Sequence, residues 1–318
     1  MSLLFLLDGP HALYRCCHAH ADLTYERDGV EHMIGGVYGF IQMLRLAHSR
    51  LGDGDAAVVV AWEDPERSTR SVRRSLYPQY KRKTPSDQEV NYGVIELRQF
   101  VREQREILEP ILSLIGVPQA YAPGWEADDV IATIAGDLPE DDVVIFTGDK
   151  DMLSLVSEHV AVMRPLKEGY ELIDKHAWTE EHIIDIGLWP EVLALAGDDS
   201  DNIPGVKGIG FKTAEKLLRE HGNLEGVLRA AAAGQVKRFG DAIDKDTGER
   251  KPGPISMMAE QIQLNLKLTT LNGQVDLVWT QPKKNEEEVE RAFREMKFHS
   301  FSSWADRQMI MGMGTDDW

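Results

Sequence analysis

The sequence predicts an α/β fold in which helices cover both faces of a mostly parallel central sheet, followed by a helical subdomain. Short runs of consecutive apolar residues predict strands buried on both faces, at residues 3–7, 56–62 and 143–146. Stretches with helical spacing separate these runs, and such alternation is typical of parallel sheets. From about Trp178 the pattern changes to short helices and glycine-rich turns. With 318 residues, the chain is long enough for both parts.

The remaining elements follow from the spacing of apolar residues. Helical spacing appears in residues 33–51, 94–115 and 286–296. A further helix is expected to begin near Trp125. Short strands are expected at residues 117–121, 160–162, 170–173 and 277–279. A hairpin around Glu168 and Gly169 would join the strands 160–162 and 170–173 at the edge of the sheet.

These elements divide the chain into three parts. Residues 1–175 form the α/β core, with a basic arch around residues 65–105. Residues 176–275 form the helical subdomain, in which the polar loop 241–254 looks like an insertion. Residues 276–318 would supply a strand and a helix that pack back on the core, and the last few residues are expected to fray.

Composition excludes several classes of protein. The formal net charge of −18 argues against a polyanion binder with a basic surface throughout, so any contact with nucleic acid must be local. Cys16 and Cys17 are the only cysteines and are adjacent, which favours a reduced, intracellular setting over a disulfide framework. Residues 1–7 lack a basic leader and predict a strand, and no apolar run is long enough to span a membrane. We therefore expect a soluble, cytoplasmic protein.

Acidic residues follow three of the predicted strands. Asp8 ends the first, Glu63 and Asp64 follow the second, and Asp149 and Asp151 follow the third. The carboxyl ends of parallel strands meet at one edge of a sheet, where ligands bind in such folds. Because carboxylates gathered there would repel one another, and no Cys or His accompanies them, Mg²⁺ or Mn²⁺ would suit the site. For Asp149 the alternative is an ordinary helix cap.

Two further acidic groups can join this edge. Glu126, Asp128 and Asp129 fall in the first turn of a predicted helix, where the helix dipole also favours acids without any ligand. Asp198 and Asp201 lie in the segment GDDSDN, which lacks the glycine and terminal glutamate of an EF-hand and could also be an Asx-rich loop.

A glycine-rich turn between two short helices follows at residues 203–222. The pattern suits a helix-hairpin-helix, in which glycines let backbone N–H groups approach a phosphate at a helix N-terminus. A plain αα-hairpin is the alternative. The DNA-binding residues expected here are Gly205, Lys207, Gly208, Gly210, Lys212, Thr213 and Lys216.

The segment 67–83 carries basic residues and no acid, with two tyrosines interleaved. Phosphate attraction combined with aromatic stacking is how proteins hold single-stranded nucleic acid. A solvated basic loop is the alternative. The candidate DNA-binding residues are Arg70, Arg73, Tyr77, Tyr80, Arg82 and Lys83.

Taken together, these motifs resemble the 5′-nuclease superfamily, which includes bacterial and phage 5′→3′ exonucleases, flap endonucleases and the N-terminal domain of bacterial DNA polymerase I. The matching segments are LLDG, AWEDP, YPQYKRKTP, EADD, TGDKD and GDDSDNIPGVKGIGFKTAEKLL. The resemblance runs from residue 3 to about 230, and more faintly to about 304. Glu63 beside Asp64 and the loop 241–254 depart from the pattern. A PIN-like, 5′-nuclease-like core is the fold that the resemblance implies.

The resemblance also implies roles for the acids and nearby cations. The ligands of a first metal ion would be Asp8, Asp64, Glu126, Asp128 and Asp149. Those of a second would be Asp151, Asp198 and Asp201, with Asp149 shared as a catalytic residue and Asp129 in support. Lys81 is expected near the scissile phosphate, with Arg74 and Lys150 as further catalytic cations.

The function implied is a two-metal DNA 5′-nuclease, acting in replication or repair as a 5′→3′ exonuclease and a 5′-flap endonuclease. It would use two Mg²⁺ ions, or Mn²⁺, with K⁺ at the helix-hairpin-helix, and would act as a monomer on DNA flaps and 5′ ends, including RNA-primed ends. The alternatives are a junction-cutting or PIN-type nuclease on the same scaffold, or a non-catalytic DNA-binding accessory protein. Comparing which substrates are cleaved would distinguish these nucleases from one another. Measuring the uptake of Mg²⁺ or Mn²⁺ would distinguish a nuclease from the accessory protein.

Overall fold

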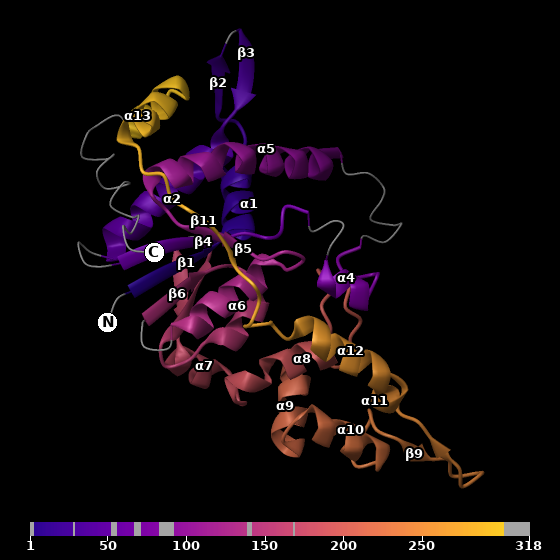
Figure 1. The fold of residues 1–318 in the computed structure, drawn as a ribbon. Coiled ribbons are helices and arrows are strands. Elements are labelled where there is room, and N and C mark those ends of the chain that lie inside the picture. The colour runs from indigo at the N-terminus through magenta and orange to yellow at the C-terminus, as the bar shows by residue number, and fades with distance from the viewer. Residues whose placement is uncertain are drawn as a thin grey trace.

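A computed structural model of the chain describes residues 3–27, 29–51, 56–66, 71–82, 92–138, 142–167 and 169–301. It contains an α/β core and a helical region that extends from one side of it (Figure 1). The central sheet has seven strands in the order β11-β5-β4-β1-β6-β7-β8. Its middle strands are parallel, and they are β5 (Gln119–Tyr121), β4 (Ala56–Ala61), β1 (Leu3–Asp8), β6 (Asp142–Phe146) and β7 (Val160–Pro165). The predicted α/β fold class is confirmed.

Antiparallel strands close both edges of the sheet. β8 (Tyr170–Ile173) pairs with β7 as the expected edge hairpin, although Glu168 in its turn lies outside the described residues. At the other edge β11 (Val278–Thr280) pairs with β5, so that the C-terminal part of the chain rejoins the core.

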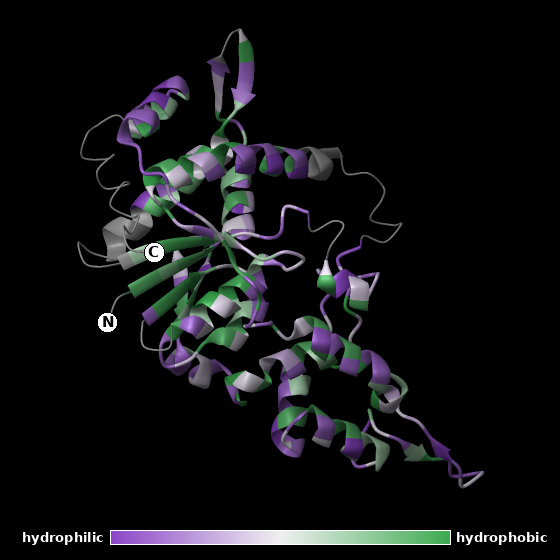
Figure 2. Ribbon diagram, viewed as in Figure 1, coloured by the Kyte–Doolittle hydropathy of each residue, from purple (hydrophilic) through white to green (hydrophobic). Residues whose placement is uncertain are grey.

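Alternating side chains of the buried strands point to opposite faces of the sheet, and both faces are covered by helices. Phe5 and Leu7 of β1 pack in one apolar cluster, and Leu4 and Leu6 pack in the other. The first cluster includes residues of α1 (Gly9–Ala19), α2 (Gly35–Leu51), α5 (Tyr92–Ile115) and α13 (Glu286–Glu295). The second includes residues of α6 (Ala127–Asp137) and the helical region. The strands appear as hydrophobic ribbons between these layers (Figure 2).

The helical region is built from short helices joined by tight turns. They are α7 (Lys175–Glu181), η3 (Ile186–Leu188), α8 (Trp189–Ala196), α9 (Phe211–His221), α10 (Leu224–Ala232), α11 (Pro254–Met257) and α12 (Ala259–Thr269). The expected insertion contains a small exposed hairpin of β9 (Ala242–Ile243) and β10 (Arg250–Lys251), which projects from this region (Figure 1). Among the described residues, no helix has the length and apolar character needed to cross a membrane.

Several elements are absent from the sequence-based prediction. They are helix α1, the hairpin β2 (Thr24–Arg27) and β3 (Val30–Met33), the short helix α4 (Val72–Leu76) and the 3₁₀ turn η4 (His299–Phe301). The hairpin is mostly polar and exposed, so it lacks the apolar periodicity on which the prediction rests. After Asp149 the chain forms a 3₁₀ helix, η2 (Lys150–Leu155), that ends before Val156. In the predicted arch, residues 67–70 and 83–91 lie outside the described residues.

Candidate active site and metal centre

The carboxyl ends of β1, β4 and β6 meet at one edge of the sheet. β1 pairs in parallel with both neighbours, with Asp8 opposite Ala61 of β4 and Leu7 opposite Phe146 of β6. The Asp8 carboxylate is buried, accepts hydrogen bonds from the Thr147 hydroxyl at 2.7 Å and the His11 amide at 3.1 Å, and caps α1. Burial raises the pKa of Asp8, and the charge of Asp149 adds to the effect. Asp8 and Asp149 therefore lie close enough to repel each other.

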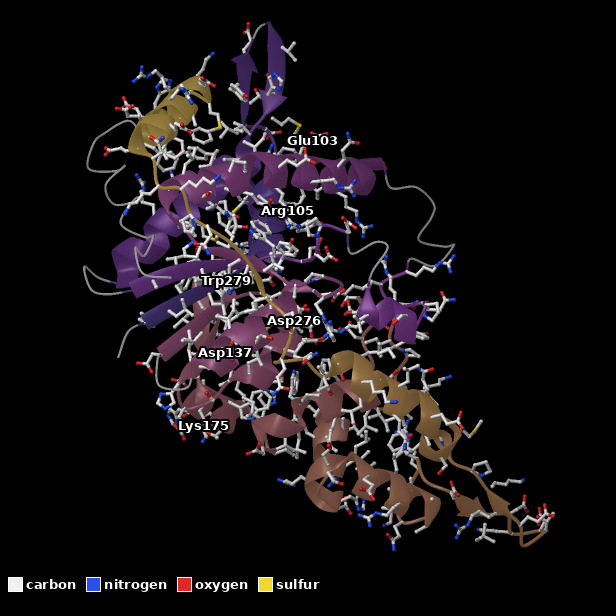
Figure 3. The ribbon with its side chains drawn as sticks, viewed as in Figure 1. Glu103, Arg105, Asp137, Lys175, Asp276 and Trp279 are labelled. Atoms are coloured by element: carbon white, nitrogen blue, oxygen red, sulfur yellow. The ribbon has the colours of Figure 1, made fainter. Side chains whose placement is uncertain are left out.

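Asp64 lies just beyond β4, and the surrounding backbone fixes its carboxylate. Oδ2 accepts a hydrogen bond from the Gly124 amide at 2.7 Å, and Oδ1 accepts one from the Glu66 amide at 2.9 Å. Asp64 is 1% exposed, whereas its neighbour Glu63 is half-buried. Arg105 of α5, labelled in Figure 3, donates to the Glu63 carbonyl at 3.2 Å and lies over the Trp62 ring. These contacts hold the segment that carries Asp64 against the core.

The start of α6 contributes two acids. Glu126 is the N-cap of α6, and its Oε2 lies 3.0 Å from the Tyr80 hydroxyl and 2.9 Å from Lys81 Nζ. Burial and the nearby charge of Asp149 raise the pKa of Asp128 well above its usual range, and Asp8 and Glu126 add to that rise. The charges of four acids, Asp8, Glu126, Asp128 and Asp149, from two strand ends and one helix thus act on one another.

A second group of carboxylates comprises Asp151, Asp198 and Asp201. Each offers one oxygen, and the three oxygens lie within 4.8 Å of one another. Oδ1 of Asp151 is buried and has no hydrogen-bond partner among the described residues. Burial, followed by the charges of Asp149, Asp201 and Asp198, raises the pKa of Asp151 well above its usual range. Burial also raises the pKa of Asp201, and Lys81 only partly offsets it.

The pKa of Asp198 shifts in the opposite direction to those of Asp151 and Asp201, although the three belong to the same group. Burial opposes its ionisation, but hydrogen bonds from Ser200 and Lys150 outweigh this effect and lower its pKa. Ser200 donates its hydroxyl to Oδ1 at 2.6 Å, and Lys150 Nζ lies 2.9 Å from Oδ2. Sequence reasoning missed Thr147 and Ser200, which orient Asp8 and Asp198. The sequence signal that could have identified these two residues is their position within the TGDKD and GDDSDN segments.

The donor set fits hard divalent cations. Oxygen ligands without sulfur or imidazole suit Mg²⁺ or Mn²⁺. The pKa values are raised first by burial and then by repulsion between the acids, and bound cations would offset both effects. The unpartnered Asp151 oxygen supports this directly, because a buried acceptor without a partner is costly.

Two lysines lie among these acids. Lys81 has a left-handed backbone with φ of 51°, its amide donates to the Asp201 carbonyl at 2.9 Å, and its Nζ lies 3.6 Å from Asp201 Oδ2. Burial disfavours the Lys81 charge, but Glu126, Tyr80, Asp128 and Asp201 together outweigh burial, so the pKa of Lys81 rises. Lys150 Nζ lies 5.4 Å from the centroid of the Phe211 ring, at the start of α9. The raised pKa keeps Lys81 protonated, and both lysines lie close to the acidic edge.

Three predicted site residues, Arg73, Asp129 and Tyr80, are buried and form hydrogen bonds to other side chains of the protein. Arg73 is 5% exposed and forms a two-pronged ion pair with Asp129, at 2.5 and 2.9 Å. Asp129, predicted as a supporting ligand, is fully buried in this pair, so its oxygens are directed at Arg73. Tyr80 is 2% exposed, and its hydroxyl lies between Glu126 and Asp201, at 3.0 and 2.9 Å. In this structure Arg73 and Tyr80 cannot contact DNA as expected, because their side chains are buried by protein.

The other residues of the basic segment lie nearer the surface. Arg74 and Tyr77 are half-buried and Arg82 is exposed, whereas Arg70 and Lys83 lie outside the described residues. Among the described residues, no ion pair joins Arg74 to the acids.

The helix-hairpin-helix turn lies between α8 and α9. Gly208 has a φ of +87°, and Gly210 is the N-cap of α9 with no side-chain cap. A Cβ on Gly205 would lie 1.9 Å from the Ala196 carbonyl oxygen, so this glycine is needed for packing against α8. The remaining predicted residues are exposed Lys207, Lys212 and Lys216 and half-buried Thr213, whose amide donates to the Gly210 carbonyl.

Comparison with known families matches both parts of the chain. Residues 3–183 match the 5′-3′ exonuclease N-terminal resolvase-like domain, and residues 185–291 match the 5′-3′ exonuclease C-terminal SAM fold. The thermostable DNA polymerase I of Thermus thermophilus is 34% identical over 298 residues, which cover 92% of this chain and 32% of the polymerase. The 5′-3′ exonuclease of Aquifex aeolicus is 31% identical over 231 residues, or 72% of this chain and 73% of that protein. The chain thus spans about a third or less of the polymerases that it matches.

Solved structures share the fold at low sequence identity. The flap endonuclease D15 of bacteriophage T5, in a complex with DNA and metal ions, has a TM-score of 0.61 and 18% identity over 98% of this chain and 99% of that chain. Flap endonuclease-1 of Methanococcus jannaschii has a TM-score of 0.59 and 18% identity, covering 98% and 92%. The resemblance inferred from the motifs is confirmed at the level of family and fold.

Proposed function

The chain belongs to the 5′-3′ exonuclease family, and we propose that it is a divalent-metal-dependent DNA nuclease that removes 5′ flaps and trims 5′ ends. The observation that carries this proposal is the group Asp151, Asp198 and Asp201, with its buried, unpartnered oxygen. The charges of Asp8, Asp128 and Asp149 act on one another where two strand ends adjoin the start of α6. A protein that only bound DNA would gain nothing from so many carboxylates beside a phosphate.

The acids divide into two ligand sets in this proposal. Asp8, Asp64, Glu126, Asp128 and Asp149 would hold one ion. Asp151, Asp198 and Asp201 would hold a second, with Asp149 contributing to both. When bound, the two ions supply Lewis-acid activation of a water molecule and charge stabilisation of the leaving 3′ oxygen.

The protein's own cations would position the substrate. Lys81 already lies between the two acid sets, 2.9 Å from Glu126 and 3.6 Å from Asp201. A scissile phosphate at this edge would offer Lys81 an alternative anionic partner, and Lys150 would do the same from the side of Asp198. Tyr80 would hold Glu126 and Asp201 in place through its hydroxyl, and Arg73 would support α6 through Asp129.

The two surfaces beside the site would hold two parts of the substrate. The turn from Gly208 to Gly210, with Lys207 and Lys212, would bind the phosphates of duplex DNA without reading sequence, with K⁺ as a candidate ion at this turn. The basic segment before α5 would guide the 5′ single strand. The substrates would include RNA-primed 5′ ends, and the protein would act as a monomer in replication or repair.

A panel of labelled DNA substrates with Mg²⁺ tests the proposal. We expect cleavage of 5′-flap, nicked and gapped duplexes, and no comparable cleavage of a four-way junction. A flap with a blocked 5′ end shows whether a free end is needed. Absence of cleavage on every DNA substrate would refute the proposal, and preference for the four-way junction would replace it with a junction-cutting enzyme.

A further inference from the structure

Arg238 lies beside the helix-hairpin-helix turn, although it belongs to the segment after α10. The nearest guanidinium nitrogen of Arg238 is 3.5 Å from the position that a Cβ on Gly208 would occupy. The same Cβ position is 3.5 Å from the Phe239 ring. Residues about thirty positions apart in the sequence therefore form one surface, at the turn that carries Lys207 and precedes α9.

The Arg238 guanidinium is exposed and has no partner of opposite charge in the described part of the chain. It lies 5.2 Å from the centroid of the Phe239 ring and makes no hydrogen bond or ion pair with the described residues. Arg229 on the neighbouring helix α10, in contrast, lies 3.9 Å from Glu225. In a chain with a formal net charge of −18, an arginine without an acidic partner is placed to attract an external anion.

The backbone around Arg238 is constrained. Arg238 has a φ of +74°, a conformation that side chains other than glycine rarely adopt. Its neighbours Val236 and Phe239 are buried, and the Phe239 carbonyl accepts a hydrogen bond from the Ile255 amide at 3.0 Å. The packing of these neighbours holds the strained residue in place, and such strain is concentrated at functional sites.

We propose that Arg238 binds a phosphate of duplex DNA next to the one bound at the Gly208 turn. This inference rests on the proposed function, and extends its duplex-binding surface beyond the helix-hairpin-helix. The planar guanidinium matches phosphate oxygens in pairs, and stacking on Phe239 limits the freedom that it would lose on binding. The contact reads the DNA backbone alone, so it contributes affinity and leaves sequence preference unchanged.

The salt dependence of duplex binding tests this assignment. Affinity for a blunt DNA duplex is measured in EDTA, by fluorescence anisotropy, between about 50 and 200 mM salt. Loss of one phosphate contact reduces the slope of log affinity against log salt by about 0.9. We expect this reduction in Arg238→Ala, with about a tenfold loss of affinity at the lowest salt. Arg238→Lys should keep the parent slope, because it keeps the charge.

Two further variants control for the loss of any exposed arginine and for a change in stability. Arg229→Ala removes an exposed arginine from the same helical region and should leave both slope and affinity unchanged. Arg238→Gly removes the side chain and relieves the left-handed backbone, so it should match Arg238→Ala in binding with a Tm at or above that of the parent. A slope in Arg238→Ala equal to that of the parent would overturn the assignment while leaving the nuclease proposal intact. A parent that neither binds duplex nor cuts flaps would refute both.

Discussion

Asp129 and Asp151 are both buried aspartates near the acidic edge, yet their environments are opposite. Both oxygens of Asp129 lie against Arg73, and Oδ1 also accepts a hydrogen bond from the Asn272 amide at 2.9 Å. Asp151 has an oxygen without any partner in the described residues and faces other acids. Both were predicted from the sequence as metal-site residues. What distinguishes them is the ion pair of Asp129 with Arg73, which lies 56 positions away in the sequence.

Neutralising each of these two aspartates should change stability in opposite directions. Asp129→Asn leaves Arg73 buried without its partner and should lower the free energy of unfolding by about 3 kcal/mol. Asp151→Asn removes a charge that burial and neighbouring acids disfavour, and should raise it by about 1 kcal/mol in EDTA. Urea unfolding in EDTA measures the free energy of unfolding of both variants and of the parent. A decrease of similar size in the two variants would contradict the described environments.

Lys81 should act in the chemical step. Lys81→Ala removes the cation that lies 2.9 Å from Glu126, and should slow flap cleavage about a hundredfold at saturating DNA. Duplex affinity should stay near that of the parent, because the duplex-binding surface is elsewhere. Lys175→Ala, which removes an exposed lysine paired with Glu158, is the control. Weak binding with normal cleavage at saturation would assign Lys81 to binding instead.

The cysteines should be unreactive in the folded protein. Burial raises the pKa of Cys16 and that of Cys17 to about 12. At pH 8 almost no thiolate is present, and both residues are buried. We expect a thiol reagent to label neither cysteine at pH 8 until the protein is unfolded in denaturant, when both should react. Rapid labelling of the folded protein would contradict the burial of Cys16 and Cys17 in α1.

At the scale of elements, apolar runs predicted the buried strands well. The strands β1, β4 and β6 were found because each consists of consecutive apolar residues within a parallel sheet. Helix α1 was missed, although Asp8 before it and Pro10 in its first turn are typical of a helix start. The β2–β3 hairpin was missed because its residues are polar, although Asp28-Gly29 is a hairpin-turn dipeptide.

Glycines in different elements should respond differently to substitution. In Gly205→Ala the new Cβ would lie 1.9 Å from the Ala196 carbonyl oxygen, and the displaced turn should cost about 3 kcal/mol of stability. In Gly136→Ala nothing lies within 4 Å of the Cβ in the exposed part of α6, so the variant should gain about 0.5–1 kcal/mol. Thermal unfolding distinguishes the two, and a stable Gly205→Ala would show that α8 and the turn are not packed this closely.

At the scale of the whole molecule, topology explains why distant acids could be assigned to one site. Parallel strands bring their carboxyl ends together whatever the length of chain between them, so Asp8 and Asp149 were predictable as neighbours. Topology does not determine which cations enter the cluster. Lys150 was expected there because it stands between Asp149 and Asp151 in the sequence, and Lys81 was expected through the family resemblance. The burial of Tyr80 and the approach of Arg238 to Gly208 depend on long-range packing without a local sequence signal.

Calorimetric titration of Mg²⁺ or Mn²⁺ into the metal-free protein tests the central claim most directly. The parent should take up divalent ions, because the acidic edge lowers its own electrostatic repulsion when it binds them. The double variant with Asp151→Asn and Asp201→Asn should lose uptake at the second ligand set while remaining folded. A parent that takes up neither ion would contradict the assignment of the acidic edge as a metal centre, and with it the nuclease mechanism.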